Sequence, residues 1–195
     1  MTERAHHSFT EAPDWLAGEM PPGYQTRLAE IQRLSEDLHG MEAIGRVLWT
    51  SGTPLKDSVH ALVTALKCDV STASGADHPL TVKLDGSRSL LLYVSALATP
   101  IQKASEVLTH VFQAVQLAGP HDRVVLVANN DPAMPPAERA DPVLPDALTV
   151  LQRMGVNVTT TATLFNLWKV SFEGPQRVRA VLDRLHAQDG GPFSA

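Results

Sequence analysis

The chain has 195 residues, a formal net charge of −5, 44% hydrophobic residues and 19% charged residues. These values are ordinary for a globular protein and predict one folded domain with an apolar core and a small appendage. A single cysteine, Cys68, excludes an internal disulfide framework and a multi-cysteine zinc site.

The first segment, residues 1–25, contains Pro13, Pro21, Pro22 and Gly23 and shows no sustained periodicity. It is predicted to be a mobile or loosely docked N-terminal arm. Its apolar residues either pack on the parent domain or a sister subunit, or form a peptide that binds a protein partner. They are Trp15, Leu16, Met20 and Tyr24.

Residues 26–49 form one long amphipathic helix in this prediction, because apolar side chains recur every three or four residues. The helix is expected to pack on the domain or against its twin in a homodimer. The stripe is too short and irregular to establish a coiled coil. The candidate dimer residues are Ile31, Leu34, Leu38 and Met41.

Residues 50–190 are predicted to form the α/β domain. A helix runs from Pro54 to about Lys67, and Cys68, Val70 and Thr72 alternate with polar residues as in a short strand. Asp85-Gly86 separates two strand-like runs, which is typical of a β-hairpin. The second arm, Leu90 to Val94, is apolar throughout and should be covered on both faces.

The remaining pattern alternates helices and strands, with an irregular Pro-rich stretch up to Asp146. It predicts an α/β fold whose mixed central sheet is flanked by helices. The expected elements are a helix near Lys103–Leu117, a parallel strand at Val124–Ala128, a helix from Asp146, a strand with Val156 and Val158, a short helix with Leu164, Leu167 and Trp168, and a last helix over Pro175–Gln188.

Familiar catalytic and cofactor motifs are missing. The sequence contains no phosphate-binding loop, no dinucleotide fingerprint and no nucleophile elbow. The eight histidines lack the spacing of metal ligands. We therefore expect no cofactor and no metal.

The arrangement of helix, hairpin, helix and parallel strand resembles the restriction-endonuclease-like, or PD-(D/E)xK, fold between about Leu48 and Trp168. Local sequence carries the resemblance at Leu48–Leu55, Arg123–Asn129 and Thr160–Phe165. In active members of that family, acidic residues and an acid-x-Lys triplet on the second hairpin arm bind a divalent metal.

Carried over to this chain, the resemblance puts the helix acid at Asp57 and the loop acid at Asp77. The acid-x-Lys triplet falls on Tyr93-Val94-Ser95, which offers neither a magnesium ligand nor a cation. Lys103 or Glu106 from the following helix could replace the lost groups. The resemblance therefore implies a nuclease fold without its catalytic residues.

A second polar group follows the strand Val124–Ala128. Asn129, Asn130 and Asp131, with Arg139 in the Pro-rich stretch, could form a small ligand pocket beyond the strand end. The favoured interpretation is structural: the Asn and Asp residues turn the chain, and Arg139 pairs with a carboxylate.

These observations predict a non-catalytic interaction or assembly module that forms a homodimer in the cytoplasm. No apolar run could span a bilayer, and the N-terminus lacks a signal-peptide pattern. The alternative is a metal-dependent nuclease with displaced ligands. Binding of nucleic acid through Arg177, Arg179 and Arg184 is possible but not favoured, because residues 51–195 hold twelve basic against thirteen acidic residues.

Overall fold

The computed structural model describes residues 16–72 and 78–194. In these residues the chain folds as an α/β protein around one mixed sheet, whose strands lie side by side in chain order. The pairs β1–β2 and β2–β3 are antiparallel, and the pairs from β3 to β6 are parallel. The strands are β1 (Asp69–Thr72), β2 (Leu80–Lys83), β3 (Ser89–Leu97), β4 (Asp122–Asn130), β5 (Asn157–Thr160) and β6 (Gly191–Pro192).

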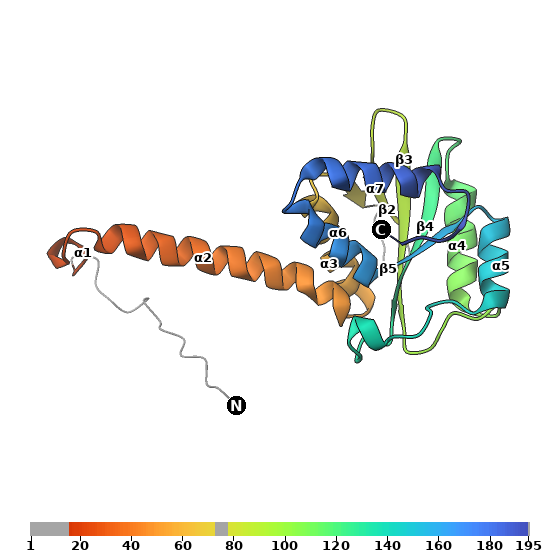
Figure 1. The fold of residues 1–195 in the computed structure, drawn as a ribbon, viewed down its shortest axis with the longest axis horizontal. Helices are drawn as coiled ribbons and strands as arrows, with labels where there is room; N and C mark the ends of the chain where they lie inside the picture. The colour runs from red at the N-terminus through yellow and green to blue at the C-terminus, as the bar shows by residue number, and fades with distance from the viewer. Residues whose placement is uncertain (1–15, 73–77, 195) are drawn as a thin grey trace. The chain divides into compact units, whose positions relative to one another are not determined.

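Helices cover both faces of this sheet. The helices α3, α6 and α7 pack on one face and α4 and α5 on the other (Figure 1). Within the described residues no helix is both long and apolar enough to cross a membrane. The helices are α1 (Leu16–Glu19), α2 (Tyr24–Gly45), α3 (Gly52–Ala65), α4 (Glu106–Leu117), α5 (Pro145–Arg153), α6 (Thr161–Ser171) and α7 (Pro175–Ala187), with 3₁₀ turns η2 (Arg46–Leu48) and η3 (Pro136–Glu138).

The strand β3 lies between the two helical layers, as its apolar run predicts. Because successive side chains of a strand point to opposite faces, Leu90 and Leu92 pack with α3, α6 and α7, whereas Leu91 and Tyr93 pack with α4 and α5. The neighbouring β4 is buried on both faces in the same way. The prediction of a doubly covered parallel strand is confirmed.

The hairpin between β2 and β3 turns at Asp85, Gly86 and Ser87. One carboxylate oxygen of Asp85 accepts hydrogen bonds from the backbone N–H groups of Ser87 (3.1 Å) and Arg88 (2.9 Å). The other accepts from Arg88 Nε at 2.6 Å. These bonds, the Arg88 side chain first among them, hold the pKa of the Asp85 carboxyl well below its usual range.

Some boundaries differ from the sequence prediction. The helix expected from Lys103 begins at Glu106, because Gln102 and Ser105 close a turn in which Ser105 Oγ accepts from Gln102 N (2.9 Å). The short strand β6 was not predicted. It forms because the carbonyls of Val156, just before β5, and of Val158 accept hydrogen bonds from Gly191 N and Phe193 N along the sheet edge.

Internal contacts divide the chain after Met41 into two units, and α2 runs across that boundary. The helix begins at Tyr24, two residues before the expected start, and ends at Gly45, where the 3₁₀ turn η2 continues the chain. Unit 2 contains the whole sheet and α3 to α7.

Candidate functional site

The positions that the nuclease resemblance assigns to the acid and the lysine lie on β3. Tyr93 is buried, and its ring stacks on His110 of α4 with 5.9 Å between ring centroids. Ser95 is half-buried on the same face of the sheet. Neither side chain can replace an acid-x-Lys pair, because a phenol is a poor magnesium ligand and a hydroxyl carries no charge.

The other residues of that expected site do not assemble around Tyr93. Asp57 is an exposed residue of α3, which packs on the sheet face opposite to Tyr93. Asp77 lies outside the described residues. Lys103 is exposed, and Glu106 contacts His110 Nε2 at 3.6 Å. Among residues 16–72 and 78–194, no three His, Cys, Asp or Glu side chains gather as a metal site would require.

Asn129, at the end of β4, is fully buried and ties three segments together. Its Nδ2 donates to the carbonyl of Thr50 (2.9 Å), and its Oδ1 accepts from Arg139 (2.8 Å) and Thr161 Oγ1 (3.0 Å). Arg139 donates its other hydrogens to the carbonyls of Leu48 (2.6 Å) and Met134 (3.0 Å), rather than to a carboxylate as the sequence suggested. Burial lowers the pKa of the Arg139 guanidinium.

The two residues after Asn129 also connect chain segments. Asn130 Nδ2 donates to the carbonyl of Ala140 at 2.5 Å. Asp131 adopts a left-handed backbone with φ of 45°, and its N–H donates to Leu97 O (3.1 Å). The hollow beside Ser95, Asn129 and Asn130 has essentially no room for even a water-sized molecule. Ligand sites usually exceed about 300 Å³, so this strand end offers little room for a small molecule.

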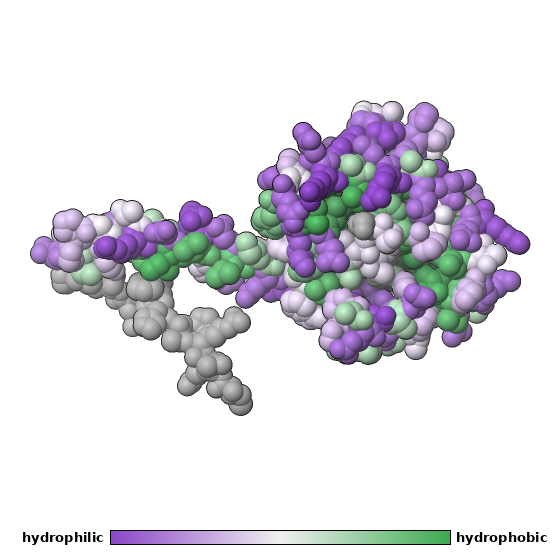
Figure 2. All heavy atoms as spheres, in the orientation of Figure 1, coloured by the Kyte–Doolittle hydropathy of each residue, from purple (hydrophilic) through white to green (hydrophobic). Residues whose placement is uncertain are grey.

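The apolar stripe of α2 is open to solvent. Its members are exposed by 51% at Ile31, 47% at Leu34, 61% at Leu38 and 46% at Met41. The intervals of three, four and three residues put them on one side of the helix. Figure 2 shows apolar side chains gathered along α2. We call these four residues the α2 stripe.

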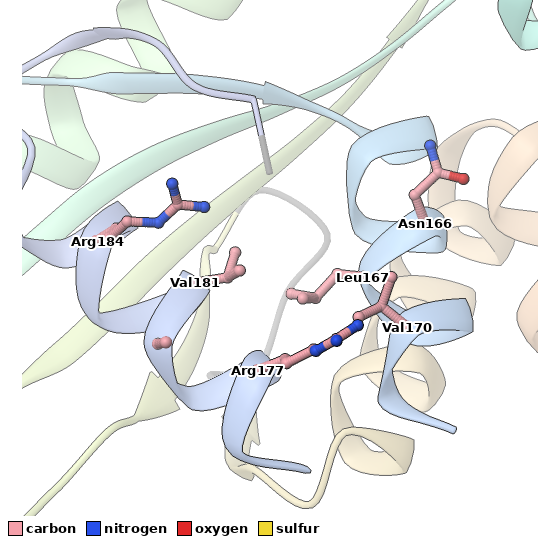
Figure 3. A pocket seen from close by; sticks show the side chains of 7 residues that line it. Asn166, Leu167, Val170, Arg177, Val181 and Arg184 are labelled. Atoms are coloured by element: carbon pink, nitrogen blue, oxygen red, sulfur yellow. The ribbon is translucent and has the colours of Figure 1, made fainter. Parts of the chain in front are cut away.

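A groove between α6 and α7, not predicted from the sequence, is another hollow of unit 2. Its volume is about 350 Å³. Arg177 and Arg184 of α7 line it, with Val181 between them and Leu167 of α6 opposite (Figure 3). The seven-residue interval between the two arginines, which puts both on one side of the helix, was the available signal. We call this hollow the α6–α7 groove.

The arginines of α7 do not form a free basic surface. Arg177 pairs with Glu173, and Arg179 pairs with Asp183 at 3.2 Å and with Asp85 at 3.8 Å. Arg184 makes a cation–π contact with Phe193, 5.8 Å from the ring centroid. Carboxylates thus neutralise two of the three charges that a nucleic-acid surface would use.

Comparison of the chain with protein-family models, with curated proteins and with solved structures finds no match. The functional conclusions therefore depend on the geometry of the chain itself.

Proposed function

We propose that this protein is a non-catalytic assembly module that forms a homodimer through the α2 stripe. The observation that carries the proposal is the exposure of four large apolar side chains in a row on one helix. Exposed apolar rows of this kind are typical of interaction surfaces, since leaving them in water is unfavourable. The spacing suits another helix, and the same stripe on a second copy matches it in length and chemistry.

The domain that carries α2 is proposed to have the restriction-endonuclease-like fold in a degenerate form. Its order of helix, antiparallel hairpin, helix and parallel strand supports the resemblance. Tyr93 and Ser95 at the acid-x-Lys positions support loss of catalysis. A cytoplasmic location stays part of this proposal, as does the absence of a cofactor.

Charges beside the stripe favour antiparallel helices. In a parallel pair, Arg27 would face the partner's Arg27, and Asp37 would lie beside the partner's Glu42 on both sides of the seam. In an antiparallel pair that aligns the stripe with itself, Ile31 faces the partner's Met41 and Leu34 faces the partner's Leu38.

The antiparallel pair brings Arg27 close to the partner's Glu42 twice. The one like-charge contact that remains, between the two Asp37 side chains, is reduced because each Asp37 pairs with Arg33 of its own helix at 3.0 Å. Exposed ion pairs contribute roughly 0.2–1 kcal/mol each. The antiparallel orientation is therefore favoured, because it replaces repulsive contacts between like charges with attractive ones. The affinity comes from burial of the two apolar α2 stripes against each other.

Light scattering of the full chain at micromolar concentration tests the dimer. We expect a dimer for the natural sequence and a monomer for the double variant Leu34→Glu, Leu38→Glu, because charges in the seam lose their hydration. The matched control is Gln32→Glu, which adds a carboxylate to the same helix away from the stripe and should stay dimeric. A monomeric natural sequence, or an unaffected double variant, would refute the proposed dimer.

Disulfide trapping tests the orientation in a Cys68→Ser background. Two Ile31 positions would be ten residues apart along antiparallel helices, or about 15 Å. A disulfide needs Cα atoms within about 7 Å. Ile31→Cys alone should therefore stay uncrosslinked, whereas a mixture with Met41→Cys should give a crosslinked mixed dimer. Efficient crosslinking of Ile31→Cys to itself would indicate parallel helices instead.

The loss of catalysis has its own test. Incubation with single- and double-stranded DNA and RNA in Mg²⁺ or Mn²⁺ should leave every substrate intact. Metal-dependent cleavage that disappears in Asp77→Ala would establish the alternative, a nuclease with displaced ligands.

A further inference from the structure

The α6–α7 groove has walls of aliphatic side chains. Each helix buries another face in the core, through Leu164 and Trp168 on α6 and through Leu182 and Leu185 on α7. Between the two helices, above the buried Leu167, lies the hollow of about 350 Å³, which is within the usual size range of small-molecule sites. Its apolar lining consists of Leu167, Val170, Ala180 and Val181.

The polar lining is basic and contains no acid. Asn166, Arg177 and Arg184 complete the wall. The two arginines are seven residues apart on α7, or about 10.5 Å along its axis, so they flank the apolar floor (Figure 3). In a chain whose net charge is −5, this hollow locally favours an anion.

Of the two arginines, Arg184 is the better placed to bind an anion. Arg177 forms an ion pair with Glu173. Among the described residues, Arg184 has no carboxylate within ion-pair distance, and its guanidinium lies over Phe193. Because an arginine stacked on a ring keeps the N–H groups along its edge, Arg184 can still bind a planar carboxylate.

We propose that the α6–α7 groove binds a single-chain aliphatic carboxylate, with its head group on Arg184 and its chain along Leu167, Val170 and Val181. A polyphosphate or nucleic-acid backbone would need several free cations, and Arg177 and Arg179 are already paired with acids. An aliphatic chain uses the apolar floor, and one carboxylate matches one available guanidinium.

Titration calorimetry of the full chain with dodecanoate, below its micelle concentration, tests this site. We expect one saturable site, and binding of dodecanol and of dodecyltrimethylammonium at least about tenfold weaker, because a charged hydrogen bond is lost or reversed. Equal affinity for the alcohol, or no dodecanoate binding, would overturn the proposal.

Three variants locate the site, each checked for an unchanged circular dichroism spectrum. Arg184→Gln should weaken binding about tenfold or more, and Ala180→Glu, which adds an acid to the groove wall, should abolish it. Glu173→Gln should tighten binding modestly, since it removes a negative charge near the groove and so favours an anion there, a gain that damage to the fold would not produce. The matched control is Arg153→Gln, an exposed arginine of α5, which should bind as the natural chain does. Unchanged binding by Arg184→Gln would exclude this groove.

The groove and the proposed dimer use different surfaces, and the same assay separates them. The variant Leu34→Glu, Leu38→Glu should bind dodecanoate with unchanged affinity. If binding instead disappears with the stripe, the ligand occupies the α2 stripe and the groove assignment is wrong.

Discussion

Replacing Asn129 with alanine should strongly destabilise the domain. The buried amide donates one hydrogen bond and accepts two, joining Thr50 before α3, Arg139 in the Pro-rich segment and Thr161 at the start of α6. At roughly 0.5–1.5 kcal/mol for each of the three hydrogen bonds, the loss is about 1.5–4.5 kcal/mol. That is a large part of the roughly 5–15 kcal/mol that stabilises a typical domain.

Urea unfolding followed by tryptophan fluorescence measures the effect. With a urea dependence of roughly 2 kcal/mol per molar, the unfolding midpoint of Asn129→Ala should fall by about 1–2 M. The matched control is Asn130→Ala, which changes the same residue type one position away. Asn130 donates one side-chain hydrogen bond, to Ala140 O, so we expect a loss of about 1 kcal/mol.

The comparison also separates the two interpretations of this polar group. If the asparagines serve a ligand, their replacement should be nearly neutral or stabilising, as is common for binding residues. If they hold the chain together, Asn129→Ala should cost about three times as much as Asn130→Ala. Equal midpoints for the two variants would refute the hydrogen-bond account.

Three further predictions concern the core, the hairpin and the thiol. Leu126→Ala, at a fully buried position of β4, should cost roughly 2–5 kcal/mol in thermal unfolding, whereas Leu117→Ala, at a residue 69% exposed, should change stability little; similar losses would contradict the assigned core. Since the pKa of Asp85 is lowered on folding, first by the Arg88 side chain, its stabilisation is present above the unfolded value of 3.8 and is lost as the pH falls below it. The melting temperatures of the natural chain and Asp85→Asn should thus differ at pH 7, and the difference should begin to shrink below about pH 4 and keep shrinking as the pH falls further; a constant difference would exclude this carboxylate as the cause. Burial raises the pKa of the Cys68 thiol, so alkylation by iodoacetamide at pH 8 should be slower than for free cysteine, and a faster rate would show an activated thiol.

Much of the local structure could be predicted because it depends on side-chain periodicity. Three elements follow directly from local sequence patterns. They are the strand β3, from its apolar run, the hairpin turn, from Asp85-Gly86, and the last helix from Pro175, from its helical spacing of apolar residues. The α2 stripe was predicted in the same way, from spacing alone. Its exposure came from the structure, because spacing describes one side of a helix and not what covers that side.

The sequence by itself determined the α/β class, the doubly covered strand and the absence of an acid and lysine at Tyr93 and Ser95. Only the tertiary structure decided that Asn129 joins segments as distant as Thr50 and Thr161, and that Arg139 donates to carbonyl oxygens. It also decided that two helices leave a groove beside Arg184. The physical reason is the range of the interactions. Side-chain periodicity depends on nearby residues and indicates whether a segment forms a helix or a strand. Buried hydrogen bonds and hollows form between elements that are far apart in the chain.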